Sequence, residues 1–114
     1  MLIRGAAFAI QGITDRSQHK VNLGGEMDLS SLPAFEAAID DACRVRAEAV
    51  VLDLSGLEFL DVAGVRAICI ARTRIVGSGM ELRIIPGPRN VHRLFEFAGL
   101  VEELPFQASA AAGS

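Results

Sequence analysis

The residues of this chain that could do chemistry are carboxylates near the ends of expected strands. Paired carboxylates can act as general acid and base, and α/β proteins build their sites at strand ends. In this sequence no nucleophile or metal-binding pattern accompanies them. We therefore interpret them as loop and helix-capping residues, and we predict that the chain is not an enzyme. In chain order they are Glu26, Asp28, Asp53, Glu58 and Asp61.

The two histidines and two cysteines form no recognisable ligand pattern. His19 falls on an expected edge strand and His92 on the polar side of an expected helix, so both are predicted to be surface residues. Cys43 and Cys69 lack the spacing of a zinc site, and no metal is expected. Both cysteines lie on apolar helix faces, which predicts buried, reduced thiols. A redox disulfide between them stays open, because the sequence does not give their separation.

Composition and motifs exclude several classes of function. A net charge of −3 and a pI near 5.3 disfavour nucleic acid as a partner, because phosphate binding requires a basic surface. The common nucleotide-binding motifs are absent from the sequence, and no cofactor is expected. No apolar run approaches the roughly 18 to 20 residues of a membrane span, and the N-terminal segment lacks the features of a signal peptide. We predict a cytoplasmic protein without direct membrane insertion.

The elements that must position these residues are expected in the order β-β-α-β-α-β-α. Strands are predicted at about 7–13 and 19–25, with a polar five-residue hairpin loop between them. Helix-start residues at 30–33 precede the first helix. Its apolar residues recur at helical spacing. They are Leu32, Phe35, Ile39, Ala42 and Cys43.

The second half of the chain begins with a buried apolar strand from Val50. We expect it to turn through Ser55 and Gly56, to present Asp61, and to enter a helix that ends near Gly77. A strand at 80–85 and a helix closed near position 99 follow, and the next two residues, 100–101, are expected to pack back onto the core. The prediction is an α/β fold with a mixed sheet, in which an N-terminal hairpin precedes parallel strands joined by helices. A single domain is expected over 1–106, with a disordered tail at 107–114.

The central stretch reads D-L-S-G-L-x-F-L-D-x-x-G from Asp53 to Gly64. It resembles the signature of the STAS domain, a family that includes bacterial anti-sigma factor antagonists. The segments 25–28 and 88–100 resemble the family's G-E-x-D motif and its last helix, and the resemblance covers about 7–104. It implies a STAS-like fold and a non-catalytic regulatory module. Such a module takes part in signalling and transcription regulation: it binds a kinase-like anti-sigma factor and so releases a sigma factor.

The resemblance also implies where the partner binds. In phosphorylated members of the family a serine directly follows the second Asp of the motif, usually with another Ser or Thr after it. This chain has Val62 and Ala63 there, so we expect no phosphorylation at either position. Without that hydroxyl the protein would be constitutively competent or controlled by another signal. The expected partner-binding residues are Glu26, Asp28, Asp61, Val62, Ala63, Gly64 and Arg66.

Several of these residues also have purely structural interpretations. Asp61 is expected to cap the following helix, where free N–H groups and the helix dipole favour negative charge. Gly64 would permit close helix–strand contact. Val62 would either pack at the helix start or offer an apolar contact to a partner.

Two alternative functions stay open. The chain resembles a STAS accessory subunit of a lipid-transport ABC system or another membrane-associated assembly, where it would brace an ATPase subunit. A small-ligand binder is the second alternative. A homodimer is also left open. Identifying the partner would separate the anti-sigma factor antagonist from the ABC accessory subunit, since the first requires an anti-sigma factor and the second a transport ATPase.

Overall fold

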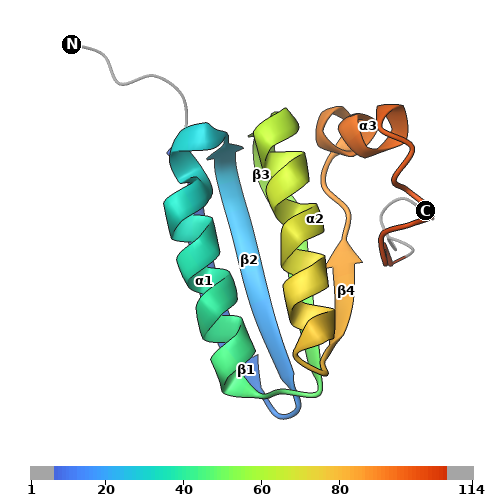
Figure 1. Ribbon diagram of the computed structural model, residues 1–114. Coiled ribbons are helices and arrows are strands. Elements are labelled where there is room, and N and C mark those ends of the chain that lie inside the picture. The colour runs from blue at the N-terminus through green and yellow to red at the C-terminus, as the bar shows by residue number, and fades with distance from the viewer. Residues whose placement is uncertain (1–6, 108–114) are drawn as a thin grey trace.

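The computed structural model describes residues 7–107 of the 114-residue chain, so all but the first residue of the expected disordered tail at 107–114 lies outside the described residues. Helices α1 and α2 lie side by side on one face of a sheet with the order β1-β2-β3-β4 (Figure 1). The elements are β1 Ala9–Asp15, β2 Gln18–Met27, the 3-10 helix η1 Leu29–Ser31, α1 Leu32–Val45, β3 Ala49–Leu60, α2 Val62–Gly77, β4 Glu81–Ile85 and α3 Arg89–Phe97.

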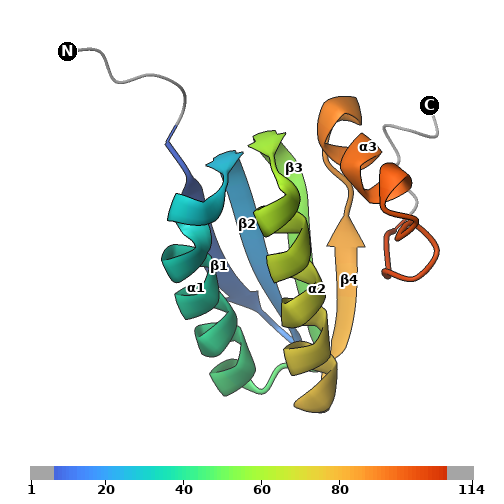
Figure 2. The ribbon, with the colours of Figure 1, turned by 45° about the horizontal axis from the view of Figure 1, so that its top comes forward.

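The strand directions confirm the predicted mixed sheet. β1 pairs with β2 in antiparallel fashion, whereas β2 with β3 and β3 with β4 are parallel. α1 therefore connects two neighbouring parallel strands, and α2 connects the next two. α3 lies beyond the end of β4, beside the first turns of α2 (Figure 2). Every helix among residues 7–107 is too short or too polar to cross a membrane.

The N-terminal hairpin is tighter than predicted. The expected five-residue loop is wrong, because the two strands stay paired up to Asp15 and Gln18 and only Arg16 and Ser17 form the turn. Arg16 has a φ of 57°, the left-handed conformation that two-residue hairpin turns require. The polar side chains of this segment are typical of a loop. The hydrogen bonds between the two strands join backbone groups, however, so an exposed strand can continue through polar residues.

β3 does not turn at Ser55 and Gly56, and that prediction is also wrong. The strand runs on to Leu60, with irregular pairing against β2 on either side of Gly24. Gly56 lies so close to β2 that a Cβ atom on it would come within 2.7 Å of the Leu23 carbonyl oxygen. The glycine therefore marks a close approach of two strands. This continuation carries β3 to the same end of the sheet as β2.

The core lies between the sheet and the helices α1 and α2. Its largest fully buried side chains come from both helices and from β2, β3 and β4, together with Phe95 of α3. Leu100 and Val101 pack against this core, which confirms the prediction that the chain returns to it after α3.

Cys43 and Cys69 are free and half-buried, and both pack against the core. They are therefore less buried than predicted, since each lies at the border of its helix's apolar face. Burial raises the pKa of the Cys69 thiol.

Both histidines are less exposed than the sequence suggested. His19 is only 6% exposed, because β1 rather than β2 is the edge strand and His19 shares the core-facing side of β2 with Val21. Its Nδ1 atom is 2.9 Å from the Thr14 hydroxyl. His92 is half-buried, because the segment after α3 turns back and places the Phe106 ring against it, 4.8 Å between centroids. The prediction of two surface histidines is wrong.

Candidate partner-binding site

The two sequence motifs meet at one edge of the sheet. Met27 at the end of β2 pairs with Leu60 at the end of β3. Since the strands are parallel, their carboxyl ends share an edge, and Asp28 and Asp61 directly follow them. The backbone N–H of Asp61 donates to the carbonyl of Met27, with an N···O distance of 3.3 Å. We call this region the carboxyl edge; it comprises residues 26–30 and 58–66.

Asp61 caps α2 as predicted. Its Oδ1 atom accepts a hydrogen bond of 2.9 Å from the N–H of Gly64, and its carbonyl accepts the first helical hydrogen bond, 3.0 Å from the N–H of Val65. The carboxylate therefore neutralises part of the positive end of the helix dipole. It is half-buried, and its position relative to the helix is set by these two bonds.

Asp28 forms a second cap, at the start of η1. Its Oδ1 atom accepts bonds of 2.9 Å from the N–H and 2.6 Å from the hydroxyl of Ser30. In return, the N–H of Asp28 donates to the Ser31 hydroxyl at 3.1 Å, which completes a capping box. The Ser30 hydroxyl is the main cause that lowers the pKa of Asp28 below its usual value. This acid is ionised at neutral pH and held in place by its neighbours.

Gly64 lets the first turn of α2 lie directly on the strand ends. A Cβ atom there would come within 2.4 Å of Leu60 Cδ1 and 3.3 Å of the Met27 carbonyl oxygen. The predicted close contact between helix and strand is therefore present. It brings the N-terminus of α2 against the end of β2 as well as that of β3.

The remaining predicted residues differ in exposure. Val62, the first residue of α2, is 75% exposed. The interpretation of Val62 as a packing residue is therefore wrong. Ala63 is half-buried and Arg66 is exposed one turn further along α2. Glu26 is half-buried within the last residues of β2, not beyond the strand as expected.

The two other acids, Asp53 and Glu58, take no part in the helix caps. Asp53 lies midway along β3, where its carboxylate is 3.5 Å from the Lys20 ammonium and accepts a hydrogen bond from Ser55. Burial raises the pKa of Asp53, but the bonds from Ser55 and the charge of Lys20 outweigh burial and leave it below its usual value. Glu58 is exposed, and its carbonyl accepts a bond of 2.9 Å from Asn90 at the start of α3. Among the described residues, no group of three or more His, Cys, Asp and Glu side chains is placed to hold a metal ion.

Sequence reasoning missed two apolar residues of the carboxyl edge. Leu29 is 71% exposed directly after Asp28, and Phe59 is 46% exposed and paired in register with Glu26. Phenylalanine residues at apolar-periodic positions are expected in the core, and Phe59 is an exception. In 55–60 each buried residue follows two exposed ones, so the usual strand alternation is lost where the pairing with β2 is irregular, and the sequence alone does not show this.

Comparison with known proteins assigns the family. A family model described as "Mlab, STAS domain" matches residues 12–105. The chain belongs to the STAS domain family. It is 31% identical over 87 residues to an anti-sigma F factor antagonist of Paenibacillus polymyxa, covering 75% of this chain and 74% of that relative. It is 30% identical over 80 residues to the anti-sigma-F factor antagonist RsfB of Mycobacterium tuberculosis, covering 70% of this chain and 65% of that relative.

The fold of this STAS domain has a counterpart of known structure. An anti-sigma factor antagonist from Mycobacterium paratuberculosis superposes with a TM-score of 0.81 at 21% identity, over 93% of this chain and 90% of that one. The predicted STAS-like fold is confirmed. In this STAS domain the carboxyl edge carries a hydroxyl at Ser30, and Ser31 follows it, but both hydroxyls are engaged in the cap formed by Asp28.

Proposed function

We propose that this STAS domain is a non-catalytic binding module that sequesters a kinase-like anti-sigma factor and thereby releases a sigma factor. The supporting observation is the carboxyl edge, where two helix-capping aspartates lie beside exposed apolar side chains. The names of the Paenibacillus and Mycobacterium tuberculosis relatives support the same function. The domain would act in the cytoplasm by competing for a surface of its partner.

The chemistry of the carboxyl edge suits a protein partner. Leu29, Phe59 and Val62 are large apolar side chains that remain exposed in the single chain. Clustered exposed apolar residues mark interaction surfaces, and aromatic residues are frequent anchors. The capped Asp28 and Asp61 are fixed before any partner arrives. The matching surface on the anti-sigma factor is therefore expected to be apolar with basic side chains around it.

Regulation of this module would differ from that of its phosphorylated relatives. Val62 has no hydroxyl to accept a phosphoryl group, so the repulsion that a phosphate would create beside Asp61 cannot arise there. We infer that the carboxyl edge is constitutively competent or is controlled by another signal. A homodimer stays a prediction.

The test is recovery of the partner on immobilised protein, followed by calorimetry with the purified partner. An anti-sigma factor that binds saturably and gives up its sigma factor is the expected result. Val62→Asp should weaken this binding, whereas the matched control Val76→Asp, which places the same charge near the other end of α2 on a side chain that is 53% exposed, should not. Specific recovery of a transport ATPase, with no anti-sigma factor bound, would contradict the proposal and favour the accessory-subunit alternative.

A further inference from the structure

A groove of about 240 Å³ runs between α1 and α2 on the outer side of the molecule. We call it the α1/α2 groove. Its floor is apolar, formed by the buried side chains Phe35, Ile39, Ala67 and Ala71. Neither the caps of the carboxyl edge nor the fold itself requires such a groove. It is a feature that the proposed function leaves unexplained.

The groove exists because α2 presents small residues to α1. Ala63, Ala67 and Ala71 recur every four residues and so lie on one face of the helix. Larger side chains at these positions would close the space. Leu29 and Ile70 line the groove and are 71% and 53% exposed. The apolar floor of the groove therefore continues into these two exposed apolar side chains, and a bound apolar group could bury the floor and the side chains together.

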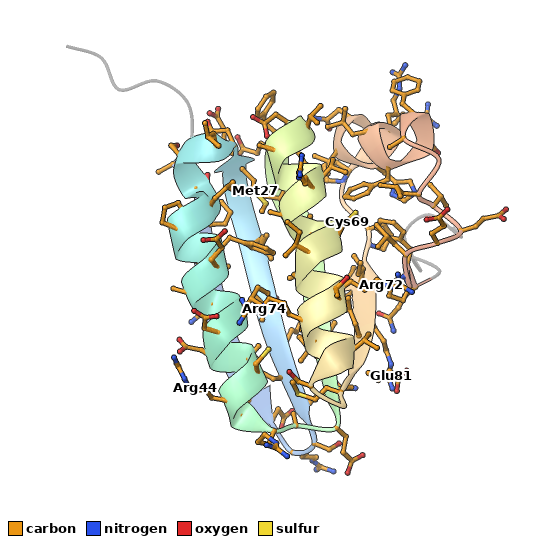
Figure 3. All side chains as sticks on the ribbon, viewed as in Figure 1. Met27, Arg44, Cys69, Arg72, Arg74 and Glu81 are labelled. Carbon is orange, nitrogen blue, oxygen red and sulfur yellow. The ribbon has the colours of Figure 1, made fainter. Side chains whose placement is uncertain are left out.

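Charge distinguishes the two ends of the groove. At one end Arg74 of α2 forms an ion pair with Asp40 of α1, which joins the two helices, and Figure 3 shows Arg74 lying between them. Glu36 also lines the groove and acts on Arg74 electrostatically. At the other end is Arg66, for which residues 7–107 provide no carboxylate within 4.0 Å. Arg66 is thus the cation left to meet an external anion.

These features suit a narrow ligand better than a protein helix. The volume lies just below the roughly 300 to 1,000 Å³ of pockets for drug-sized molecules. A helix, about 10 to 12 Å wide with its side chains, would have to pass over the Arg74–Asp40 ion pair. A single flexible chain can lie on the floor and end before that pair. A guanidinium at the open end matches a carboxylate, which it can bind through two hydrogen bonds.

We propose that the α1/α2 groove binds a small amphipathic anion, a single alkyl chain that ends in a carboxylate. The chain lies on the apolar floor, and the carboxylate lies at Arg66. Leu29, Ala63 and Arg66 also belong to the carboxyl edge, so the ligand would reach the surface on which the proposed function rests. Binding of the ligand itself requires no protein partner, and its test is independent of the proposed function.

The first test is a calorimetric and NMR titration with sodium decanoate below its micelle concentration. Decyltrimethylammonium, which has an unbranched alkyl chain of nearly the same length and the opposite charge, serves as the matched ligand. We expect saturable binding of decanoate, shifts confined to the groove residues of α1 and α2, and at least about tenfold weaker binding of the ammonium compound. Absence of saturable decanoate binding, or equal affinity for both compounds, would overturn the proposal.

Two pairs of variants locate the site. Ile70→Glu places a carboxylate in the groove and should weaken decanoate binding at least about tenfold, whereas Val76→Glu, on an equally exposed side chain of α2 outside the lining, should leave it unchanged. Arg66→Gln should weaken binding about fivefold, the upper range for an exposed ion pair, and Arg72→Gln should have no effect.

Arg72→Gln is the control for Arg66→Gln, because Arg72 points away from the groove (Figure 3). Equal losses within either pair would overturn the proposal. So would a result in which Ile70→Glu abolishes binding of the anti-sigma factor while wild-type protein does not bind decanoate. In that case the groove would be part of the protein interface.

Discussion

Replacing Val62 by Asp separates the stability of the fold from binding at the carboxyl edge. Val62 is the first residue of α2 and is 75% exposed, so the change removes little buried apolar surface. Negative charge near a helix N-terminus is favourable by about 0.3 to 1 kcal/mol, which offsets the repulsion from neighbouring Asp61. The free energy of unfolding should therefore change by less than about 1 kcal/mol.

In the complex the same carboxylate would be enclosed by an apolar partner surface. An unpaired charge at such a position costs about 3 to 5 kcal/mol, which corresponds to a loss of affinity of at least about 100-fold. The stability and affinity effects therefore differ strongly in size. Thermal melting and calorimetric titration with the anti-sigma factor on the same variant would measure both.

The control is again Val76→Asp, which should leave the affinity unchanged and lower the free energy of unfolding by about 0.3 to 1 kcal/mol, because negative charge is unfavourable in the last turn of a helix. An unaltered affinity in a correctly folded Val62→Asp variant would show that Val62 is outside the interface. That result would refute our placement of the partner. A steep fall in melting temperature would instead show that the first turn of α2 is buried, contrary to the exposure seen here.

Three other predictions concern a glycine pair, a buried histidine and the missing hydroxyl. In chemical denaturation, Gly64→Ala should lower the free energy of unfolding by about 1 to 3 kcal/mol, because the new Cβ would overlap a neighbouring leucine side chain. Gly77→Ala is the control: its Cβ would meet nothing within 4 Å, and the change should raise the free energy of unfolding by about 0.5 to 1 kcal/mol. Burial lowers the pKa of His19 below the model-peptide value of 6.5, so the unfolded chain takes up the proton more readily. The contribution of His19 to the free energy of unfolding should therefore be complete above pH 6.5 and fall as the pH drops below it. His19→Gln should remove this part of the pH dependence. The same pH dependence of stability in the variant and the wild type would contradict the burial of His19. Incubation with an anti-sigma kinase and ATP should leave Val62 and Ala63 unmodified, whereas the Val62→Ser variant should accept phosphate. Mass spectrometry that finds phosphate at Ser30 in the wild-type chain would show that phosphorylation occurs at another position.

The start of α2 could be predicted from sequence because its signals are local. An apolar strand, an aspartate and a glycine three residues later are together sufficient to predict a capped helix. The same local reasoning failed at Ser55 and Gly56. What decides that position is the neighbouring backbone of β2, which approaches too closely for a side chain and lies 32 residues earlier in the chain.

The errors at His19, Leu29 and Phe59 have a related cause. Whether a side chain is covered depends on which element lies over it, and local patterns do not contain that information. His19 became buried because β1 is added outside β2, and Phe59 is 46% exposed although it lies next to the buried Leu60 at the end of β3. The α1/α2 groove could not be foreseen either, since its alanines matter only once the two helices are known to be neighbours.

The order of the sheet has a consequence for how the molecule forms. Each strand pairs with the strand that precedes it in the chain, across a tight turn for β1 and β2 and across a helix for the two parallel pairs. Each new strand therefore adds to an edge that already exists, although parallel pairing across a helix keeps the contact order in the intermediate range of mixed α/β domains. The carboxyl edge needs only β2, α1, β3 and the start of α2, all of which leave the ribosome before β4 and α3. The surface that meets a partner can therefore take shape during synthesis, with the last strand and helix completing the far side of the core.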